Sequence, residues 1–242
     1  MARIKPARGR VRMNESILAQ QKKWESIRIA NLYDTLDELG YPNQCIDLTI
    51  KPLITGSQVA GIAVTVRGSR TPYTAEELKE HKKKIDFEHL LPLIYPGSMV
   101  VVDGGGDKLA GKFGEMTSWA LQQRGATGIV VDGYIRDYPG LLEIPGFTAC
   151  ARGTSPIESD KRWAIHELNI PIGLPGTLTS YVRVAPGDWI VGGSDGVIVV
   201  PKEIATIVLE KALDIEEREE GMRRDLAKGI SFEEAYKTWG RA

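Results

Sequence analysis

The sequence predicts a single α/β domain with flanking helices at both ends, and three observations support this fold class. A strand, a glycine-rich loop, a helix and a second strand follow one another from Pro96 to Val131, and such a βαβ unit is typical of α/β sheets. Beyond it, short β-branched runs alternate with turn sequences. Near both ends, apolar residues recur at helical spacing. Because no repeat and no low-complexity linker divides the chain, we expect one domain over residues 1–242.

The N-terminal third is predicted to contain a tail, helices, a strand and an insertion. Residues 1–13 are basic, without an acid or a following apolar segment, and indicate a basic flexible tail. Residues 14–40 predict one or two amphipathic helices. Residues 58–67 predict a strand that is buried on both faces. The charge-rich segment 73–89 predicts a helical surface insertion.

The rest of the chain is predicted to combine strands with two helices. Strands at 99–102 and 129–131 flank a helix that Gly125 closes as a C-cap. The sequence 194–196 is a turn signal between short strands. A final helix is predicted over residues 202–228.

Composition and charge exclude several classes of protein. The chain has 242 residues, 42% of them hydrophobic, which suffices for a buried core. Its net charge of -1 creates no field that would favour nucleic acid or an anionic membrane as a partner. Cys45 and Cys150 are too few for a disulfide framework, and no apolar run approaches the roughly 20 residues that span a bilayer. We therefore expect a soluble, cytoplasmic protein.

The glycine-rich loop invites comparison with nucleotide-binding motifs. Residues 106–112 have the spacing of a P-loop, and residues 129–132 are similar to the acidic strand that accompanies one. Phe113, however, stands where a serine or threonine hydroxyl would bind magnesium. The dinucleotide fingerprint also fails, because Leu109 occupies the place of its third glycine. A nucleotide site is therefore not predicted.

A better candidate site joins the start of a helix to the end of a strand. The predicted helix after Gly114 leaves free backbone N–H groups, to which a small carboxylate can bind. After the next strand, the turn sequence 132–133 is followed by Arg136 and Asp137, at the edge of the sheet where α/β sites lie. An arginine fork binds a carboxylate or an enolate, and an aspartate oxygen binds a hard cation. On spacing alone, a surface Arg–Asp pair without function explains the sequence equally well.

The sequence around this candidate site resembles a known family. Glu115, twenty intervening residues and Arg136-Asp137 lie within GEMTSWALQQRGATGIVVDGYIRD. This segment is similar to the acid-x20-Arg-Asp motif of the class II 4-hydroxy-4-methyl-2-oxoglutarate aldolases, which are grouped with the regulator of ribonuclease activity A (RraA). The blocks NLYDTLDELGY, VAGIAVTVRG, ARGTSP and VRVAPGDWIVGGSDGVIVVP also resemble the family. The resemblance implies a ββα swivelling-domain fold, and a homotrimer or a dimer of trimers with active sites between subunits.

The resemblance also implies a binding role for several motif residues. Asp137 would hold Mg²⁺ or Mn²⁺, largely through water molecules. Arg136 would bind the pyruvyl part of a 2-oxo acid substrate together with the segment that contains Gly114, Met116 and Thr117.

The implied activity is retro-aldol cleavage of a 4-hydroxy-2-oxo acid, such as 4-hydroxy-4-methyl-2-oxoglutarate, to pyruvate. Arg136 and Glu115 would be the catalytic residues, and Glu115 would handle the proton of the C4 hydroxyl. Oxaloacetate decarboxylation, which passes through the same enolate, is the expected side activity.

Two departures from the family pattern affect the site, namely Gly140 and the charged insertion 73–89, which is longer than in the compact members and would suit a different substrate tail. The aldolases usually carry an acid three residues beyond the Arg-Asp pair, where this chain has Gly140. They also receive an acid from the C-terminal region of a neighbouring subunit, for which four closely spaced candidates exist: Glu216, Glu217, Glu219 and Glu220. Metal affinity or substrate choice is therefore expected to differ from that of the compact members.

Two alternatives stay open beside the aldolase. One is a non-enzymatic binding protein that regulates a ribonuclease by contact. The regulators of the family carry glycine at the position of Glu115, so this acid favours an enzyme. The other is a lyase of the same family that acts on a different substrate derived from a sugar acid.

The remaining polar residues have structural explanations. Asp132-Gly133 and Asp195-Gly196 are typical of tight turns. Arg152 is expected either to bind the distal carboxylate of the substrate or to form a structural salt bridge. Asp103 and Asp107 are expected to be solvated in their loop, and three histidines without ligand spacing are expected at the surface, namely His81, His89 and His166.

Overall fold

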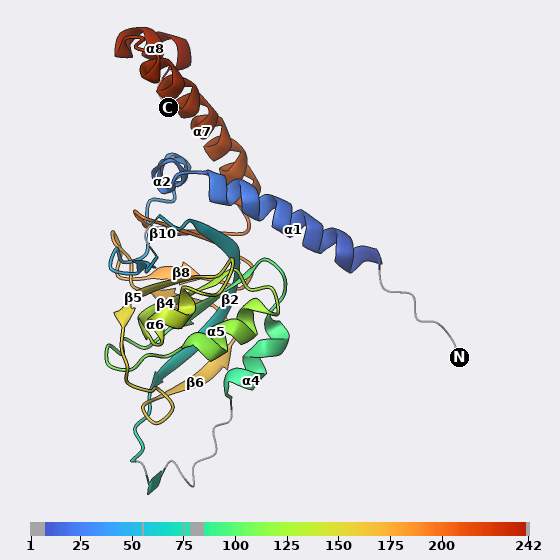
Figure 1. Ribbon diagram of the computed structural model, residues 1–242, viewed down its shortest axis with the longest axis vertical. Helices are drawn as coiled ribbons and strands as arrows, with labels where there is room; N and C mark the ends of the chain where they lie inside the picture. Colours follow the sequence, from blue (N-terminus) through green and yellow to red (C-terminus); the bar gives the residue numbers. More distant parts are fainter. Residues whose placement is uncertain (1–7, 55, 75, 78–84, 241–242) are drawn as a thin grey trace, which may run out of the picture.

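The computed structural model describes the chain except for residues 1–7, 55, 75, 78–84 and 241–242. A mixed α/β body surrounds one eight-stranded sheet, and helices from both ends of the chain extend away from it (Figure 1). The predicted single α/β domain with N- and C-terminal helices is thus confirmed. The strands are β1 Lys51–Pro52, β2 Val59–Arg70, β3 Ser98–Asp103, β4 Gly128–Ile135, β5 Thr148–Thr154, β6 Trp163–Leu168, β7 Ile172–Leu174, β8 Val182–Val184, β9 Trp189–Gly193 and β10 Gly196–Val200.

The sheet has a parallel centre and antiparallel edges. Its order is β1-β5-β4-β3-β2-β9-β10, and β6 pairs with the far end of β2. β2, β3, β4 and β5 run parallel to one another. The carboxyl ends of β3 and β4 therefore lie side by side, which is where binding sites form in such sheets.

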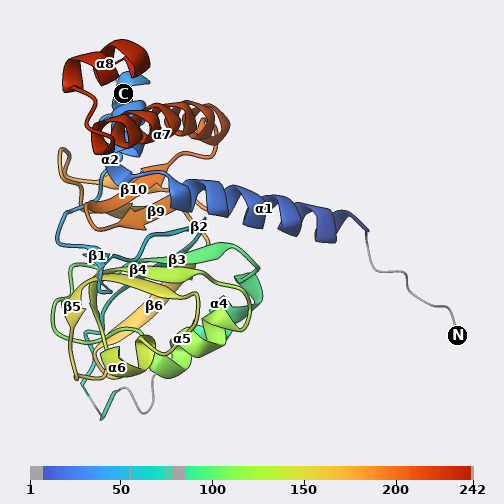
Figure 2. The same ribbon diagram turned by 45° about the horizontal axis from the view of Figure 1, so that its top comes forward.

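Both faces of the central strands are covered, as their continuous apolar runs predict. Along β3, Val100 and Val102 face a core that is closed by three helices, whereas Met99 and Val101 face a second core against β7 and β8. A third core lies under the terminal helices. Two of these helices, α2 and α7, cover the end of the sheet that contains β9 and β10 (Figure 2). The helices are α1 Arg8–Ser26, α2 Ile29–Glu38, α4 Phe87–Leu90, the 3₁₀ turn Leu91–Leu93, α5 Glu115–Gln122, α6 Tyr138–Leu141, α7 Ala205–Ala227 and α8 Phe232–Trp239.

The terminal helices differ from expectation in their limits. α1 begins at Arg8, inside the segment predicted as a basic tail, and the predicted helical region 14–40 divides into α1 and α2. α8 was not predicted. It folds back on α7, where the ring of Trp239 packs on Gly221 so closely that a Cβ there would lie 2.6 Å from the ring.

Residues 75 and 78–84 of the predicted helical insertion 73–89 lie outside the described residues, and its C-terminal part contributes the start of α4. None of the described helices is long and apolar enough to cross a bilayer.

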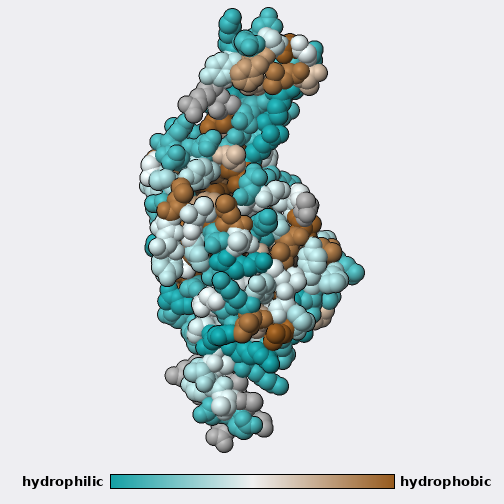
Figure 3. Space-filling model, turned by 90° about the vertical axis from the view of Figure 1, so that its left-hand side faces the viewer, coloured by the Kyte–Doolittle hydropathy of each residue, from teal (hydrophilic) through white to brown (hydrophobic). Residues whose placement is uncertain are grey.

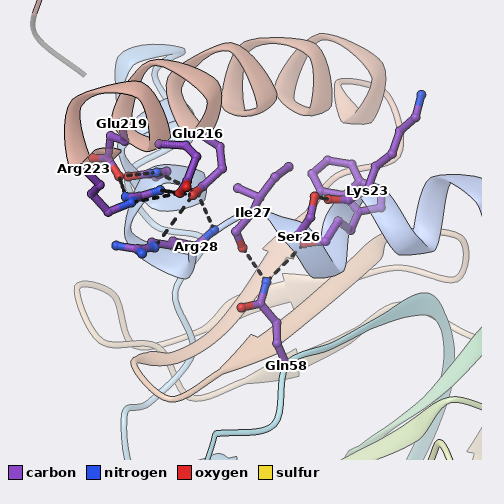
Figure 4. Close-up of polar contacts among 11 residues, drawn as sticks. Lys23, Ser26, Ile27, Arg28, Gln58, Glu216, Glu219 and Arg223 are labelled. Carbon is purple, nitrogen blue, oxygen red and sulfur yellow. Dashed lines mark hydrogen bonds and ion pairs between the residues drawn. The ribbon is translucent and has the colours of Figure 1, made fainter. Parts of the chain in front are cut away.

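A polar network ties α7 to the junction between α1 and α2 (Figure 4). Glu216 accepts hydrogen bonds from the Arg28 backbone N–H (3.0 Å) and from Asn31 (2.9 Å), and Asn31 also donates to Glu219 (2.9 Å). Arg223 ion-pairs with Glu216 (2.7 Å), Glu219 (2.8 Å) and Glu220 (3.0 Å). Three of the four C-terminal glutamates are therefore engaged within the chain. In the described part of the chain, no hydrogen bond or ion pair is found for Glu217.

Candidate active site

The end of β4 places Arg136 and Asp137. The prediction of a turn at Asp132-Gly133 is wrong, because both residues lie inside β4. The register with β5 shifts between Val131 and Tyr134, and Gly133 has a φ of 150°, a value that side chains disfavour. The sequence signal of a turn therefore marks a bulge, which lets the strand continue as far as Ile135.

Asp137 has a left-handed backbone conformation, with φ 58° and ψ 41°, and it precedes α6. Aspartate and asparagine tolerate this region better than other residues with side chains. The carboxylate lies 3.3 Å from Nε of Arg136, and both side chains are partly exposed. The left-handed turn thus aims two neighbouring side chains toward the same side.

The start of α5 packs directly against this pair. Gly114 precedes the helix. The hydroxyl of Thr117 accepts a hydrogen bond from the Gly114 N–H (3.0 Å) and donates one to the Gly114 carbonyl (2.9 Å). A Cβ on Gly114 would lie 2.4 Å from Oδ2 of Asp137 and 2.9 Å from Cγ of Arg136. Glycine is therefore required for the helix start to approach the two side chains. Among the described hydrogen bonds, none uses the N–H of Met116 or Thr117 as donor.

A pocket of about 440 Å³ opens at this junction. It brings together five of the six residues proposed from the sequence, because Gly114, Met116, Thr117, Arg136 and Asp137 all line it. The remaining wall is acidic in part and apolar in part, and its side chains include Asp86, Glu158, Asp160, Phe87, Phe113, Trp163 and Ile165. Phe113 ends the segment that was compared with a P-loop. The other residues of this wall come from segments with no motif, so the sequence did not indicate them.

The sixth residue, Glu115, lies beside the pocket and packs on α6. A Cβ on Gly140 would lie 2.1 Å from Oε2 of Glu115. The space that a side chain at position 140 would enter is thus filled by the carboxylate of Glu115. The absence of a side chain at Gly140 is what makes this placement possible.

Substitution of Gly140 by alanine should therefore displace the Glu115 carboxylate and lower any turnover that depends on it. A fall in kcat with unchanged helix content by circular dichroism is the expected result. Gly146→Ala, at a glycine where a Cβ would meet no atom within 4 Å, controls for the loss of a glycine. Gly146 has a φ of 67°, so alanine strains the backbone there more than it does at Gly140. Wild-type kcat in Gly140→Ala would show that the position of Glu115 is unimportant.

Asp107 is not solvated as predicted; it is buried in an ion-pair cluster. Its carboxylate contacts Nε of Arg70 at 2.8 Å and Nζ of Lys112 at 3.0 Å. Burial alone would raise the pKa of Asp107, but the hydrogen bonds from Arg70 and Lys112 outweigh it and keep the pKa below its usual value. Burial lowers the pKa of Lys112, and Asp107 opposes this shift.

Arg152 forms the structural salt bridge. Its Nε lies 2.7 Å from Oδ1 of the buried Asp132, and its Nη1 lies 3.3 Å from Asp47. Arg152 is not among the described pocket residues. Asp103 ion-pairs with Arg67 at 3.6 Å, and burial raises the pKa of Asp103.

Two of the three histidines have local partners at the surface. His89 lies 2.7 Å from Asp86, which caps α4, and His166 lies 2.8 Å from the Ser69 hydroxyl. His81 lies outside the described residues.

The residues present suit a hard cation that is held mainly by water. Among the described residues, no group of three or more histidine, cysteine, aspartate or glutamate side chains could hold a metal ion. The partly exposed Asp137 carboxylate nevertheless faces a pocket with further carboxylates, Glu158 and Asp160. Mg²⁺ typically keeps several waters and binds through one or two carboxylates. A single chain therefore offers Asp137 as the carboxylate ligand for such an ion.

Comparison with known proteins identifies the family. The family model "RraA-like: Aldolase/RraA" matches residues 29–199. A "Putative 4-hydroxy-4-methyl-2-oxoglutarate aldolase" of Halalkalibacterium halodurans is 32% identical over 188 residues, which are 78% of this chain and 81% of that protein.

Two solved structures have a similar fold. RraAS2 of Streptomyces coelicolor, described as an unusual member of the RNase ES inhibitor RraA protein family, has a TM-score of 0.69 and 27% identity over 85% of this chain and 96% of that chain. A structure described as "Crystal structure of novel cellulases from microbes associated with the gut ecosystem" has a TM-score of 0.73 and 25% identity, and the match covers 91% of this chain and 90% of that chain. The chain therefore belongs to the RraA-like family of aldolases and RraA proteins.

Proposed function

We propose that this protein is a divalent-metal-dependent lyase that cleaves a 4-hydroxy-2-oxo acid and releases pyruvate. The observation that carries the proposal is the packing of Arg136 and Asp137 against the open start of α5 in one pocket. An anion-binding fork, free backbone amides and a hard-cation ligand thereby meet at one point. The relative from Halalkalibacterium halodurans suggests 4-hydroxy-4-methyl-2-oxoglutarate as the first substrate to test.

Binding of the pyruvyl group falls to the helix start and the arginine. The N–H groups of Met116 and Thr117 and the guanidinium of Arg136 would bind the carboxylate and the 2-oxo oxygen. Asp137 would hold Mg²⁺ or Mn²⁺, which supplies Lewis-acid stabilisation of the enolate when bound. Arg136 adds positive charge where the enolate oxygen develops.

Glu115 is the proposed base. When the bond between C3 and C4 breaks, the C4 hydroxyl would lose its proton to a water molecule that Glu115 positions or deprotonates. C4 thereby becomes a carbonyl carbon, and the bonding electron pair passes to C3 as an enolate. Protonation of C3 then yields pyruvate. Oxaloacetate decarboxylation follows the same path with CO₂ as the second product, and it needs no base for a hydroxyl.

The assembly is proposed to be a homotrimer or a dimer of trimers in the cytoplasm, with sites between subunits. Of the four C-terminal glutamates, Glu217 remains outside the network around Arg223. It is therefore our candidate for the acid that reaches a neighbouring site.

A substrate panel tests the proposal. Pyruvate release from 2-oxo and 4-hydroxy-2-oxo acids, including sugar-acid derivatives, is measured with Mg²⁺, with Mn²⁺ and with EDTA. Turnover that EDTA abolishes and Mg²⁺ or Mn²⁺ restores is the expected result. Unchanged turnover in EDTA contradicts the metal, and no turnover across the panel favours the non-enzymatic ribonuclease-binding alternative.

A further inference from the structure

We propose that Lys112 is a positioning residue of this site, whose buried ammonium group fixes the glycine-rich loop that supports Arg136. The inference deepens the proposed function and rests on it for its kinetic consequences. Lys112 is not part of the acid-x20-Arg-Asp motif, and the chemistry proposed above does not use it.

The ammonium group of Lys112 is fully buried and fully hydrogen-bonded. Nζ donates to the backbone carbonyl of Asp107 (2.8 Å), to its carboxylate (3.0 Å) and to the carbonyl of Ala110 (3.4 Å), and the side chain has no exposed surface. A lysine ammonium has three N–H donors, so all of them are used. These hydrogen bonds link the end of the loop 107–112 to its beginning.

The surrounding backbone is shaped to admit this side chain. A Cβ on Gly133 would lie 2.5 Å from Nζ, and a Cβ on Gly104 would lie 3.0 Å from Cε of Lys112. These glycines stand at the bulge of β4 and just beyond β3. The lysine stem therefore passes between the ends of the two central strands, where no side chain from either glycine obstructs it.

The loop that Lys112 fixes is bonded in turn to the residues that place Arg136. The N–H of Lys112 donates to the carbonyl of Tyr134 (2.9 Å), and the N–H of Arg136 donates to the carbonyl of Phe113 (2.9 Å). A Cβ on Gly111 would lie 2.7 Å from Cβ of Arg136. A shift of the loop therefore moves Gly114 relative to Arg136 and Asp137.

Lys112 acts through Arg136 rather than on the substrate. Its Nζ faces three protein oxygens and not the pocket space, although other atoms of the residue line that pocket. It is thus unsuited to form a Schiff base with a 2-oxo acid. Borohydride reduction in the presence of pyruvate should leave Lys112 unmodified, and a trapped adduct on this residue would overturn the inference.

The main test is Lys112→Met, which keeps most of the stem and removes the charge. We expect kcat/KM for pyruvate release to fall by about 10²-fold, as a small misplacement of substrate-positioning groups can cause. Backbone amides of residues 111–114 and 134–137 should also exchange with deuterium faster than in wild type. Thr127→Val is the matched control, because Thr127 bonds the Ala60 carbonyl (2.9 Å) at the opposite end of β4. It should lower the melting temperature and leave kcat/KM near wild type.

A double variant separates positioning from general destabilisation. If Lys112 acts through Arg136, Lys112→Met should cost much less in the Arg136→Lys background than alone, because interacting residues are not additive. Equal losses in both backgrounds, or a loss no larger than that of Thr127→Val, would overturn the inference. The deuterium-exchange measurement does not depend on turnover. If the wild type is inactive but Lys112→Met exchanges faster, only the proposed function is rejected. If exchange in Lys112→Met is unchanged, the role of Lys112 is rejected.

Discussion

Asp137→Asn is expected to leave a folded protein that releases almost no pyruvate. Asparagine tolerates the left-handed conformation of Asp137 and matches its volume, so the turn into α6 should persist. What is lost is the negative charge beside Arg136, and with it the ligand for a hard cation. Loss of Lewis-acid stabilisation worth several kcal/mol corresponds to a rate lower by about 10³-fold or more. A coupled assay of pyruvate release at saturating Mg²⁺ measures this loss of rate.

Glu143→Gln is the matched control for this substitution. Glu143 is an exposed acid shortly after α6 and does not line the pocket, so its loss makes the same change in charge nearby. Its kcat/KM should equal that of wild type. Near-normal activity in Asp137→Asn, with unchanged dependence on Mg²⁺, would assign Asp137 to the turn alone.

Glu115→Gln is expected to impair aldol cleavage far more than decarboxylation. The carboxylate is half-buried against Gly140, where a glutamine of the same shape fits. Loss of an acid–base group typically costs about 10²–10⁴-fold. Oxaloacetate has no hydroxyl proton to remove, so its decarboxylation should retain most of its rate. Both reactions are measured on the same preparation of the variant.

The ratio of the two losses decides the role of Glu115. Equal losses would mean that the residue serves metal binding or the geometry of the helix start. No loss in either reaction would remove Glu115 from the site. Gly140→Ala, which moves the same carboxylate without removing it, should reproduce the preference for decarboxylation in weaker form.

Periodicity and caps predicted the parts of the fold that local chemistry determines. The apolar runs around Val64, Val100 and Val130 correspond to β2, β3 and β4, and the start of α5 after Gly114 follows its sequence signal. Arg136 and Asp137 do follow β4, although β4 ends at Ile135 and not at Val131 as predicted. These are short-range features, which neighbouring residues suffice to specify.

The features that escaped prediction depend on contacts between distant segments. The burial of Asp107 requires Arg70 from the end of β2, and the role of Asp132 requires Arg152 from β5. Both aspartates carry glycine neighbours, so they were indistinguishable from turn residues in sequence. The pocket wall likewise combines segments around Phe87 and Trp163 that share no motif with the loop at Gly114.

The network around Arg223 implies that the molecule opens in stages. It joins residues 188 positions apart, such as Arg28 and Glu216, through partly exposed polar groups. Contacts of this kind close long loops and belong to the less stable end of a native structure. The pocket draws its support from the buried strands β3 and β4 instead. The N-terminal half of α7 is anchored in the third core by Val208, Leu209 and Ala212, so separate opening is confined to α8 and the C-terminal end of α7, and it leaves the pocket closed.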